Sequence, residues 1–195
     1  MLITVEVMRE SNIKLGKASD RKIIEHIKKL DGFIDIVEIK DSQQNRYSIQ
    51  GVDKLQNDIN MILGIDYILV MNTKQGYQTY YIDTKGFTYK PIHNGALTDG
   101  IVETILLQVS KLYGGRWYKG WANNSEHWTT HILILINDHI YYMNYKRLVS
   151  YCNDFLQAND DTIEFDKKYG NYEYCIKASI EDLKVKGVIT DIRRL

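Results

Sequence analysis

Three pairs of β-rich segments, each joined by a short polar turn, constrain the fold of this 195-residue chain most strongly. Runs of β-branched and aromatic residues separated by a few turn-forming residues predict hairpins, in which the two strands are antiparallel. Because helical segments lie between them, the sequence predicts an α+β fold with a mixed, antiparallel-rich central sheet flanked by helices. The predicted hairpins span residues 66–83, 131–145 and 162–177.

The remaining segments alternate between extended and helical patterns. Residues 101–113 fit both a helix and a buried strand, and we favour a strand for their second half. Ser19 is placed to cap a helix, and Ser179 with Asp182 resembles a capping box. Strands are expected at 2–8 and 33–39, helices at 20–30, 55–63, 146–157 and after Ser179, and loops at 41–47, 89–95 and 114–125.

Composition restricts the class of protein. The 25 Lys and Arg balance the 25 Asp and Glu, which argues against a polycation that binds nucleic acid by net charge alone. Cys152 and Cys175 form no CxxC pair and are expected to be core thiols in a reducing compartment. No apolar run approaches the roughly 20 residues of a membrane span. The N-terminus has no basic leader, so we expect a cytoplasmic protein without membrane contact.

Two acidic residues and a lysine meet at one end of the first predicted hairpin. Asp66 begins the first strand, so antiparallel pairing brings residues 83–85 opposite it. Asp83 and Lys85 are one residue apart and therefore point to the same face of the sheet. Two neighbouring carboxylates repel each other unless a cation lies between them, and Mg²⁺ prefers carboxylate and water oxygens. The sequence therefore predicts a Mg²⁺ site, with Lys85 placed to orient a water or to stabilise charge on a phosphate.

These residues resemble the PD-(D/E)XK nuclease superfamily, in which an Asp opening one strand and a D/E-x-K on the next form the metal site. The matching segments are GIDY at 64–67 and IDTKG at 82–86. The resemblance implies a restriction-endonuclease-like core, a Mg²⁺ cofactor for which Mn²⁺ substitutes, DNA as the partner, and a homodimer. It covers residues 51–136, so we expect one nuclease-like domain over 1–195, with a strand and helix in 1–50 and a hairpin and helices in 137–195.

The resemblance also implies a further acid from a preceding helix and a polar residue after the lysine. Asp53 and Asp58 are candidate metal ligands, whereas Glu25 lies opposite the apolar face of its predicted helix. Each of the three has an alternative interpretation as a surface or capping carboxylate. Gln108 interrupts an apolar run, and a buried amide needs partners. It is a candidate to orient Lys85 or a metal-bound water, or else it lies on an exposed strand face.

The predicted loop at 114–125 interleaves cations with aromatic residues. Arg116, Lys119 and Trp121 are candidate nucleic-acid contacts, since cations pair with phosphates and aromatic rings stack on bases. The sequence leaves it equally open that Trp117 and Trp121 are packing anchors over a sheet edge.

The function that these residues predict is a metal-dependent endonuclease that hydrolyses DNA at Asp66, Asp83 and Lys85. The alternative is a non-catalytic nucleic-acid- or protein-binding module on the same fold, which would bind no divalent metal. A third hypothesis is an interaction protein, of the toxin, immunity or viral accessory kind, whose tyrosine-rich surface contacts another chain.

Overall fold

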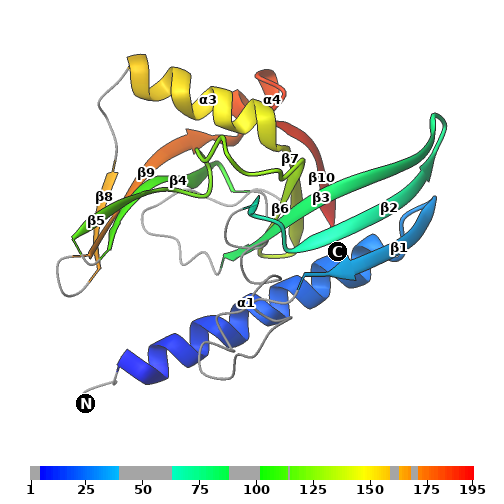
Figure 1. Cartoon of the computed structure of the whole chain (residues 1–195), viewed down its shortest axis with the longest axis horizontal. Coiled ribbons are helices and arrows are strands. Elements are labelled where there is room, and N and C mark those ends of the chain that lie inside the picture. Colours follow the sequence, from blue (N-terminus) through cyan, green and yellow to red (C-terminus); the bar gives the residue numbers. More distant parts are fainter. Residues whose placement is uncertain (1–4, 40–62, 88–101, 114, 159–162, 168–170) are drawn as a thin grey trace.

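Two β-sheets with helices on their outer sides form the part of the chain that the computed structural model describes, namely residues 5–39, 63–87, 102–113, 115–158, 163–167 and 171–195 (Figure 1). The elements in chain order are α1 (Val5–Ile27), β1 (Phe33–Glu38), β2 (Tyr67–Thr73), β3 (Gly76–Phe87), β4 (Thr104–Tyr113), β5 (Arg116–Lys119), β6 (His131–Ile136), β7 (His139–Asn144), α3 (Tyr145–Ala158), β8 (Ile163–Lys167), β9 (Asn171–Ser179), α4 (Ile180–Val185) and β10 (Ile189–Arg194). Six strands form one sheet in the order β1-β2-β3-β6-β7-β10, and the other has the order β5-β4-β9-β8.

The three predicted hairpins are confirmed as β2–β3, β6–β7 and β8–β9. The turns of β2–β3 and β6–β7 contain residues that adopt positive φ at low cost: Gly76 has φ +96° and Asn137 has φ 55°. Every strand pair is antiparallel except β3 with β6, whose parallel pairing makes the six-stranded sheet mixed. The α+β class and the antiparallel-rich sheet are therefore confirmed.

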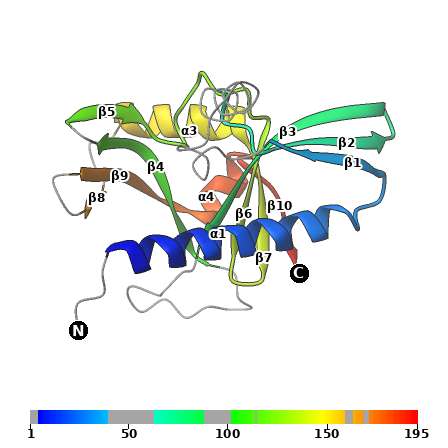
Figure 2. The same ribbon diagram turned by 60° about the horizontal axis from the view of Figure 1, so that its bottom comes forward.

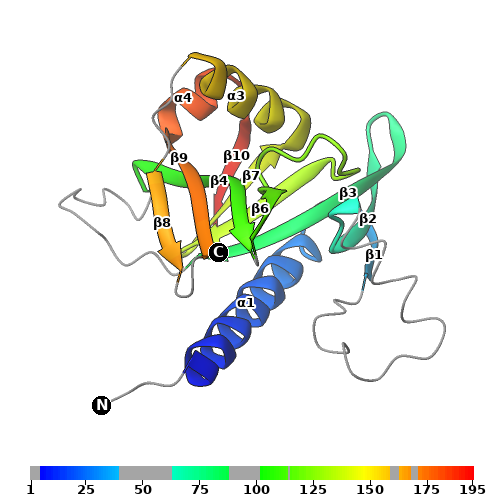
Figure 3. The same ribbon diagram turned by 60° about the vertical axis from the view of Figure 1, so that its left-hand side comes forward.

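Both faces of the six-stranded sheet are covered. On one face α1 packs through Ile23 and Ile27, which contact apolar residues of β2, β3, β6 and β7. On the other face the alternate residues of β6 and β7 join α3, α4 and the second sheet in a larger core. The different views agree that α1 crosses one side of the sheet, while α3 lies on the opposite side (Figures 2 and 3). A residue on β3 therefore faces either α1 or the larger core.

The other elements confirm part of the predicted order. β1, α3 and the strand in the second half of 101–113 are as expected, and the Ser179 side chain accepts a hydrogen bond from the Asp182 N–H at the start of α4. Cys152 and Cys175 are both buried, and neither is joined in a disulfide. No helix among the described residues is long and apolar enough to cross a membrane.

The N-terminal prediction was wrong. Residues 5–8 are helical, and Ser19 lies inside α1 instead of capping it. A short alternating pattern fits either a strand or a helix. The residues that follow are good helix formers, so the helix that Ile23 and Ile27 anchor on the sheet extends toward the N-terminus through residues 5–8. The predicted loop at 114–125 also contains β5, and β10 was not expected at all. Both are edge strands: β5 pairs only with β4, whose other neighbour is β9, and β10 pairs only with β7, whose other neighbour is β6. The features expected at 41–47, 55–62 and 89–95 lie outside the described residues.

The central position of β6 predicts a large stability cost for truncating its buried side chains. Ile134 is fully buried in the larger core, so Ile134→Ala leaves a cavity and is expected to lower the free energy of unfolding by about 2–5 kcal/mol. Val37→Ala on the exposed side of β1 serves as the control, with an expected change within about 0.5 kcal/mol. Urea denaturation of both variants measures this, and equal effects would contradict the assigned core.

Candidate active site

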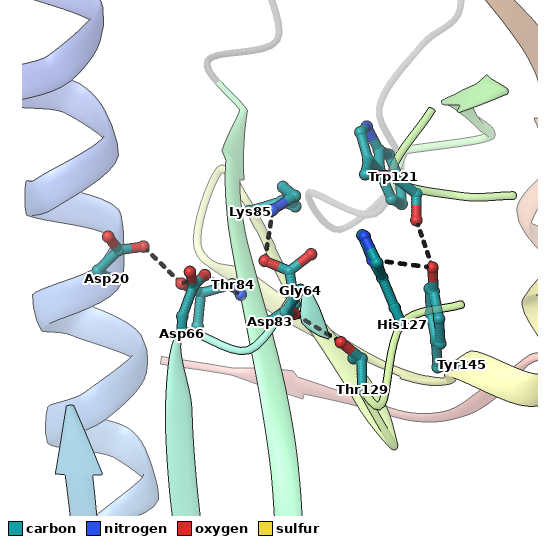
Figure 4. Close-up of polar contacts among 10 residues, drawn as sticks. All are labelled: Asp20, Gly64, Asp66, Asp83, Thr84, Lys85, Trp121, His127, Thr129 and Tyr145. Atoms are coloured by element: carbon teal, nitrogen blue, oxygen red, sulfur yellow. Dashed lines mark hydrogen bonds and ion pairs between the residues drawn. The ribbon is translucent and has the colours of Figure 1, made fainter. Parts of the chain in front are cut away.

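The β2–β3 hairpin brings Asp66 beside Asp83 at its open end, as the spacing predicts. Tyr67 pairs with Ile82, and the Asp66 N–H donates to the Ile82 carbonyl at 2.8 Å. The Asp66 carboxylate is close enough to Asp83 for a direct interaction between the two side chains. Asp66 lies just before β2 begins, where the chain enters the sheet, so its side chain stands at the margin of β3 (Figure 4).

Asp83 and Lys85 share one face of β3, which confirms the predicted alternation. The parallel register pairs Asp83 with Ile132 and Lys85 with Ile134, and both isoleucines belong to the larger core. Asp83 is therefore only 6% exposed, and the Lys85 ammonium forms an ion pair with its carboxylate. The Lys85 side chain is 28% exposed, so this face of the site opens to solvent at the lysine.

Burial and charge act together on this pair. Burial is the main cause that raises the pKa of Asp83 well above its usual value, and the charge of Asp66 raises it further. The charge of Lys85 lowers this pKa but does not outweigh burial. Burial also disfavours the Lys85 ammonium, but the negative charges of Asp83, Asp66 and Asp20 outweigh it and raise the pKa of Lys85. The lysine therefore stays charged, and the negative charges of Asp66 and Asp83 repel each other.

Thr84 points to the opposite face of β3, toward α1. Its N–H donates to Asp66 Oδ2 at 2.8 Å, and its hydroxyl lies 3.0 Å from the same oxygen and 2.9 Å from Asp20 Oδ1. A hydroxyl has one hydrogen to give, so it serves two ionised carboxylates poorly. Burial raises the pKa of Asp20 to about 6, with a further contribution from the charge of Asp66. The hydrogen bond that the Thr84 hydroxyl donates to Asp20 acts in the opposite direction and lowers this pKa, but burial outweighs it.

Asp20 is the acidic residue that the sequence analysis missed. It precedes Ile23 by three residues and Ile27 by seven, so it lies on the helix face that packs against the sheet. That spacing indicates the buried face of the helix. Because the predicted helix began at Asp20, this residue was treated as part of the helix terminus and not of the face that packs on the sheet. Glu25, which was considered instead, is exposed. Asp53 and Asp58 lie outside the described residues.

His127 and Tyr145 line the side of β3 that carries Asp83 and Lys85 (Figure 4). Burial, and next to it the charge of Lys85, lower the pKa of His127, so the ring is close to the ammonium. Burial and the charge of Asp83 raise the pKa of Tyr145. The His127 and Tyr145 rings are stacked with 6.1 Å between centroids. The sequence analysis assigned no role to either residue.

The other predicted site residues lie elsewhere. Gln108 is half-buried on β4, in the second sheet. Arg116 and Lys119 are exposed on β5, where Lys119 pairs with Glu126 at 2.9 Å. Trp121 packs against the larger core, which is the anchor role that the sequence left open for it. Trp117 is 60% exposed, so it offers the aromatic surface that was expected of Trp121.

The acidic pair fits a hard divalent cation with few protein ligands. No three His, Cys, Asp or Glu side chains are grouped to hold a metal ion anywhere in the described ranges. Mg²⁺ is commonly bound by one or two carboxylates, with waters and substrate phosphates completing its shell. Asp66 and Asp83 supply such a pair, and a bound cation would offset both causes that raise the pKa of Asp83, its burial and the charge of Asp66. A four-ligand zinc site has no basis in these residues.

Comparisons with known proteins add nothing to this assignment. No family model, no curated protein and no solved structure matches the chain. Function must therefore be argued from the chemistry of the site itself.

The raised pKa of Asp20 predicts a pH-dependent stability difference for Asp20→Asn, measured without divalent metal. The folded-state pKa, about 6, exceeds the ordinary value of 3.8, so this group stabilises the wild type at low pH. That stabilisation is lost as the pH rises from about 4 through about 6. Asparagine mimics the protonated form, so Asp20→Asn is expected to be more stable than the wild type at pH 8 and equally stable at pH 4.

Urea denaturation across this pH range measures the difference. Glu25→Gln on the exposed side of α1 is the matched control, and its offset from the wild type should not change over the same range. A variant Asp20→Asn that is less stable than the wild type at pH 8 would refute the assigned environment of Asp20.

Proposed function

We propose that this chain is a divalent-metal-dependent nuclease with a restriction-endonuclease-like core, which hydrolyses DNA phosphodiester bonds at Asp66, Asp83 and Lys85. The observation that carries the proposal is the juxtaposition of two carboxylates with a protonated lysine at the open end of one hairpin. The resemblance of GIDY and IDTKG to the PD-(D/E)XK pattern supports it.

Each residue has a distinct task in this proposal. Asp66 and Asp83 hold Mg²⁺ or Mn²⁺, which supplies a Lewis acid and lowers the pKa of a bound water. Lys85 is charged and partly exposed, so it can hold the attacking water or stabilise negative charge that develops on the phosphate. Thr84 fixes the Asp66 carboxylate through two hydrogen bonds, and Asp20 fixes Thr84 from α1.

The exposed strand β5 is the proposed contact for nucleic acid beyond the site. All four of its residues are exposed, and the cations Arg116 and Lys119 flank the rings of Trp117 and Tyr118. Cations pair with phosphates, and exposed rings stack on unpaired bases. The strand leads directly into the segment that carries Trp121 and His127, so bound nucleic acid would extend from β5 toward the acidic pair.

One observation favours a different function. The Lys85 ammonium already neutralises Asp83 by direct contact, so the site is electrostatically satisfied in part without a metal. The alternative is therefore a non-catalytic module that binds nucleic acid or protein on the same surface. It differs from the nuclease in one measurable respect, because it binds neither Mg²⁺ nor Mn²⁺ in calorimetry.

The nuclease proposal predicts that Asp83→Asn abolishes cleavage while the fold persists. The amide keeps the size of the side chain but loses the charge that a metal requires, so the rate should fall by about a hundredfold or more. Cleavage of supercoiled plasmid and of single-stranded DNA with Mg²⁺ or Mn²⁺ measures the effect. Asp154→Asn, an exposed carboxylate of α3, should cut as the wild type does. Full activity of Asp83→Asn would place the site elsewhere.

The proposed contact at β5 predicts a loss of oligonucleotide binding in Trp117→Ala. Loss of one stacked base should weaken binding roughly tenfold, since base stacking contributes about 1–3 kcal/mol. Tyr77→Ala at the tip of the β2–β3 hairpin removes a ring that is 77% exposed and should have no effect. Fluorescence anisotropy of a labelled single-stranded oligonucleotide in EDTA compares the two variants. Equal losses, or none, would remove β5 from the binding surface.

A further inference from the structure

The segment 120–130, which we call the His127 loop, is held at both ends by one residue. Tyr145 begins α3, and its N–H donates to the Thr130 carbonyl at 3.0 Å. Its hydroxyl lies 3.0 Å from the Trp121 carbonyl and 2.9 Å from that of Asn124. A buried side chain at the start of a well-packed helix therefore closes the loop into a fixed shape.

The ring of His127 has a defined orientation within this loop. The Asn124 Oδ1 accepts from the Glu126 N–H at 3.2 Å, which leaves the Asn124 amide nitrogen to donate to His127 Nε2 at 2.7 Å. Since Nε2 is an acceptor, the neutral ring carries its hydrogen on Nδ1, which faces the Tyr145 hydroxyl at 3.3 Å. The charged neighbours are Lys85 on β3, Lys119 on β5 and Glu126 in the loop itself.

The His127 loop contacts residues 63 and 64, which lead into β2, through hydrogen bonds and close packing. The Trp128 N–H donates to the Leu63 carbonyl at 2.9 Å, and the Thr129 hydroxyl donates to the Gly64 carbonyl at 2.6 Å. The His127 ring packs on Gly64 so closely that a Cβ at this position would lie 2.2 Å from Nδ1. Gly64 also has φ +65°, which favours glycine. Space and backbone conformation thus both require glycine here.

Asp66 follows two residues after Gly64, the residue on which the His127 ring packs. Ile65 between them is buried, and Asp66 is held at its other side by Ile82 and Thr84 of β3. The position of the Asp66 carboxylate is thus set from two directions, by β3 and by the loop. The contacts of Asp66 with β3 do not involve His127, whereas the contact of the loop with Gly64 depends on the His127 ring.

We propose that His127 is a positioning residue of this site, whose ring clamps Gly64 and thereby fixes the Asp66 carboxylate beside Asp83. The inference rests on the proposed function for its consequence, because metal binding by the pair requires both carboxylates in register. Residues that orient metal ligands from outside typically contribute about 10- to 100-fold to metal affinity.

The test compares three full-length variants by three measurements. His127→Ala removes the ring, His127→Phe keeps a ring over Gly64, and His131→Ala removes a half-buried histidine that contacts Tyr80 instead. The measurements are Mn²⁺ affinity by calorimetry, kcat and KM for DNA cleavage, and hydrogen exchange of the Asp66 amide. That amide is bonded to the Ile82 carbonyl, so its exchange reports the position of Asp66 whether or not a metal binds.

The proposal expects His127→Ala to weaken Mn²⁺ binding and to lower kcat by about tenfold or more, with KM unchanged and Asp66 exchange accelerated. His127→Phe should recover most of the Mn²⁺ affinity and of the exchange protection, and His131→Ala should match the wild type. Wild-type behaviour of His127→Ala, or equal losses in His131→Ala, would overturn it.

Failure of the proposed function gives a different result. If the wild type binds no Mn²⁺ and cuts no DNA, the nuclease proposal is wrong, and Asp66 exchange alone decides the role of His127. Faster exchange in His127→Ala than in His131→Ala then supports the clamp, and equal exchange overturns it.

Discussion

The double pairing of β3 is the constraint on which the rest of the structure depends. Because β3 is antiparallel to β2 and parallel to β6, its two faces are fixed against different parts of the molecule. Thr84 meets α1, whereas Asp83 and Lys85 point toward the larger core. Asp66 stands at the margin between the two faces and interacts with both. Two carboxylates are thereby held together at low exposure, an arrangement that costs free energy unless a cation offsets it. This cost is the physical basis of the proposed metal site.

The features that the sequence predicted are those encoded by neighbours along the chain. Hairpins need only two strand-forming runs and a turn, so the β2–β3 register and the meeting of Asp66 with Asp83 follow from residue spacing. The shared face of Asp83 and Lys85 follows from strand alternation. The capping of α4 by Ser179 is equally local. In each case the residues that make the contact lie within about one supersecondary unit of each other.

The features that the sequence did not predict depend on contacts between distant segments. Asp20 reaches Thr84 across 64 positions, and its helix could be placed only by its packing on the sheet. His127 lies on the site because the loop that carries it is closed by Tyr145 and laid over Gly64. Gln108 shows the converse, since a polar residue in an apolar run marks no particular site and here lies in the second sheet. Residue type and periodicity contain no information about which segments a third element will bring together.

Anomalous diffraction from crystals of the full chain soaked in Mn²⁺ would test the central claim most directly. The account predicts one anomalous peak between the carboxylates of Asp66 and Asp83, at the distances of metal–oxygen bonds, with the Lys85 ammonium moved off Asp83. A cation at that place takes over the charge that Lys85 neutralises in its absence. A map without a peak there, in which Lys85 still contacts Asp83, would contradict the metal site and with it the proposed nuclease.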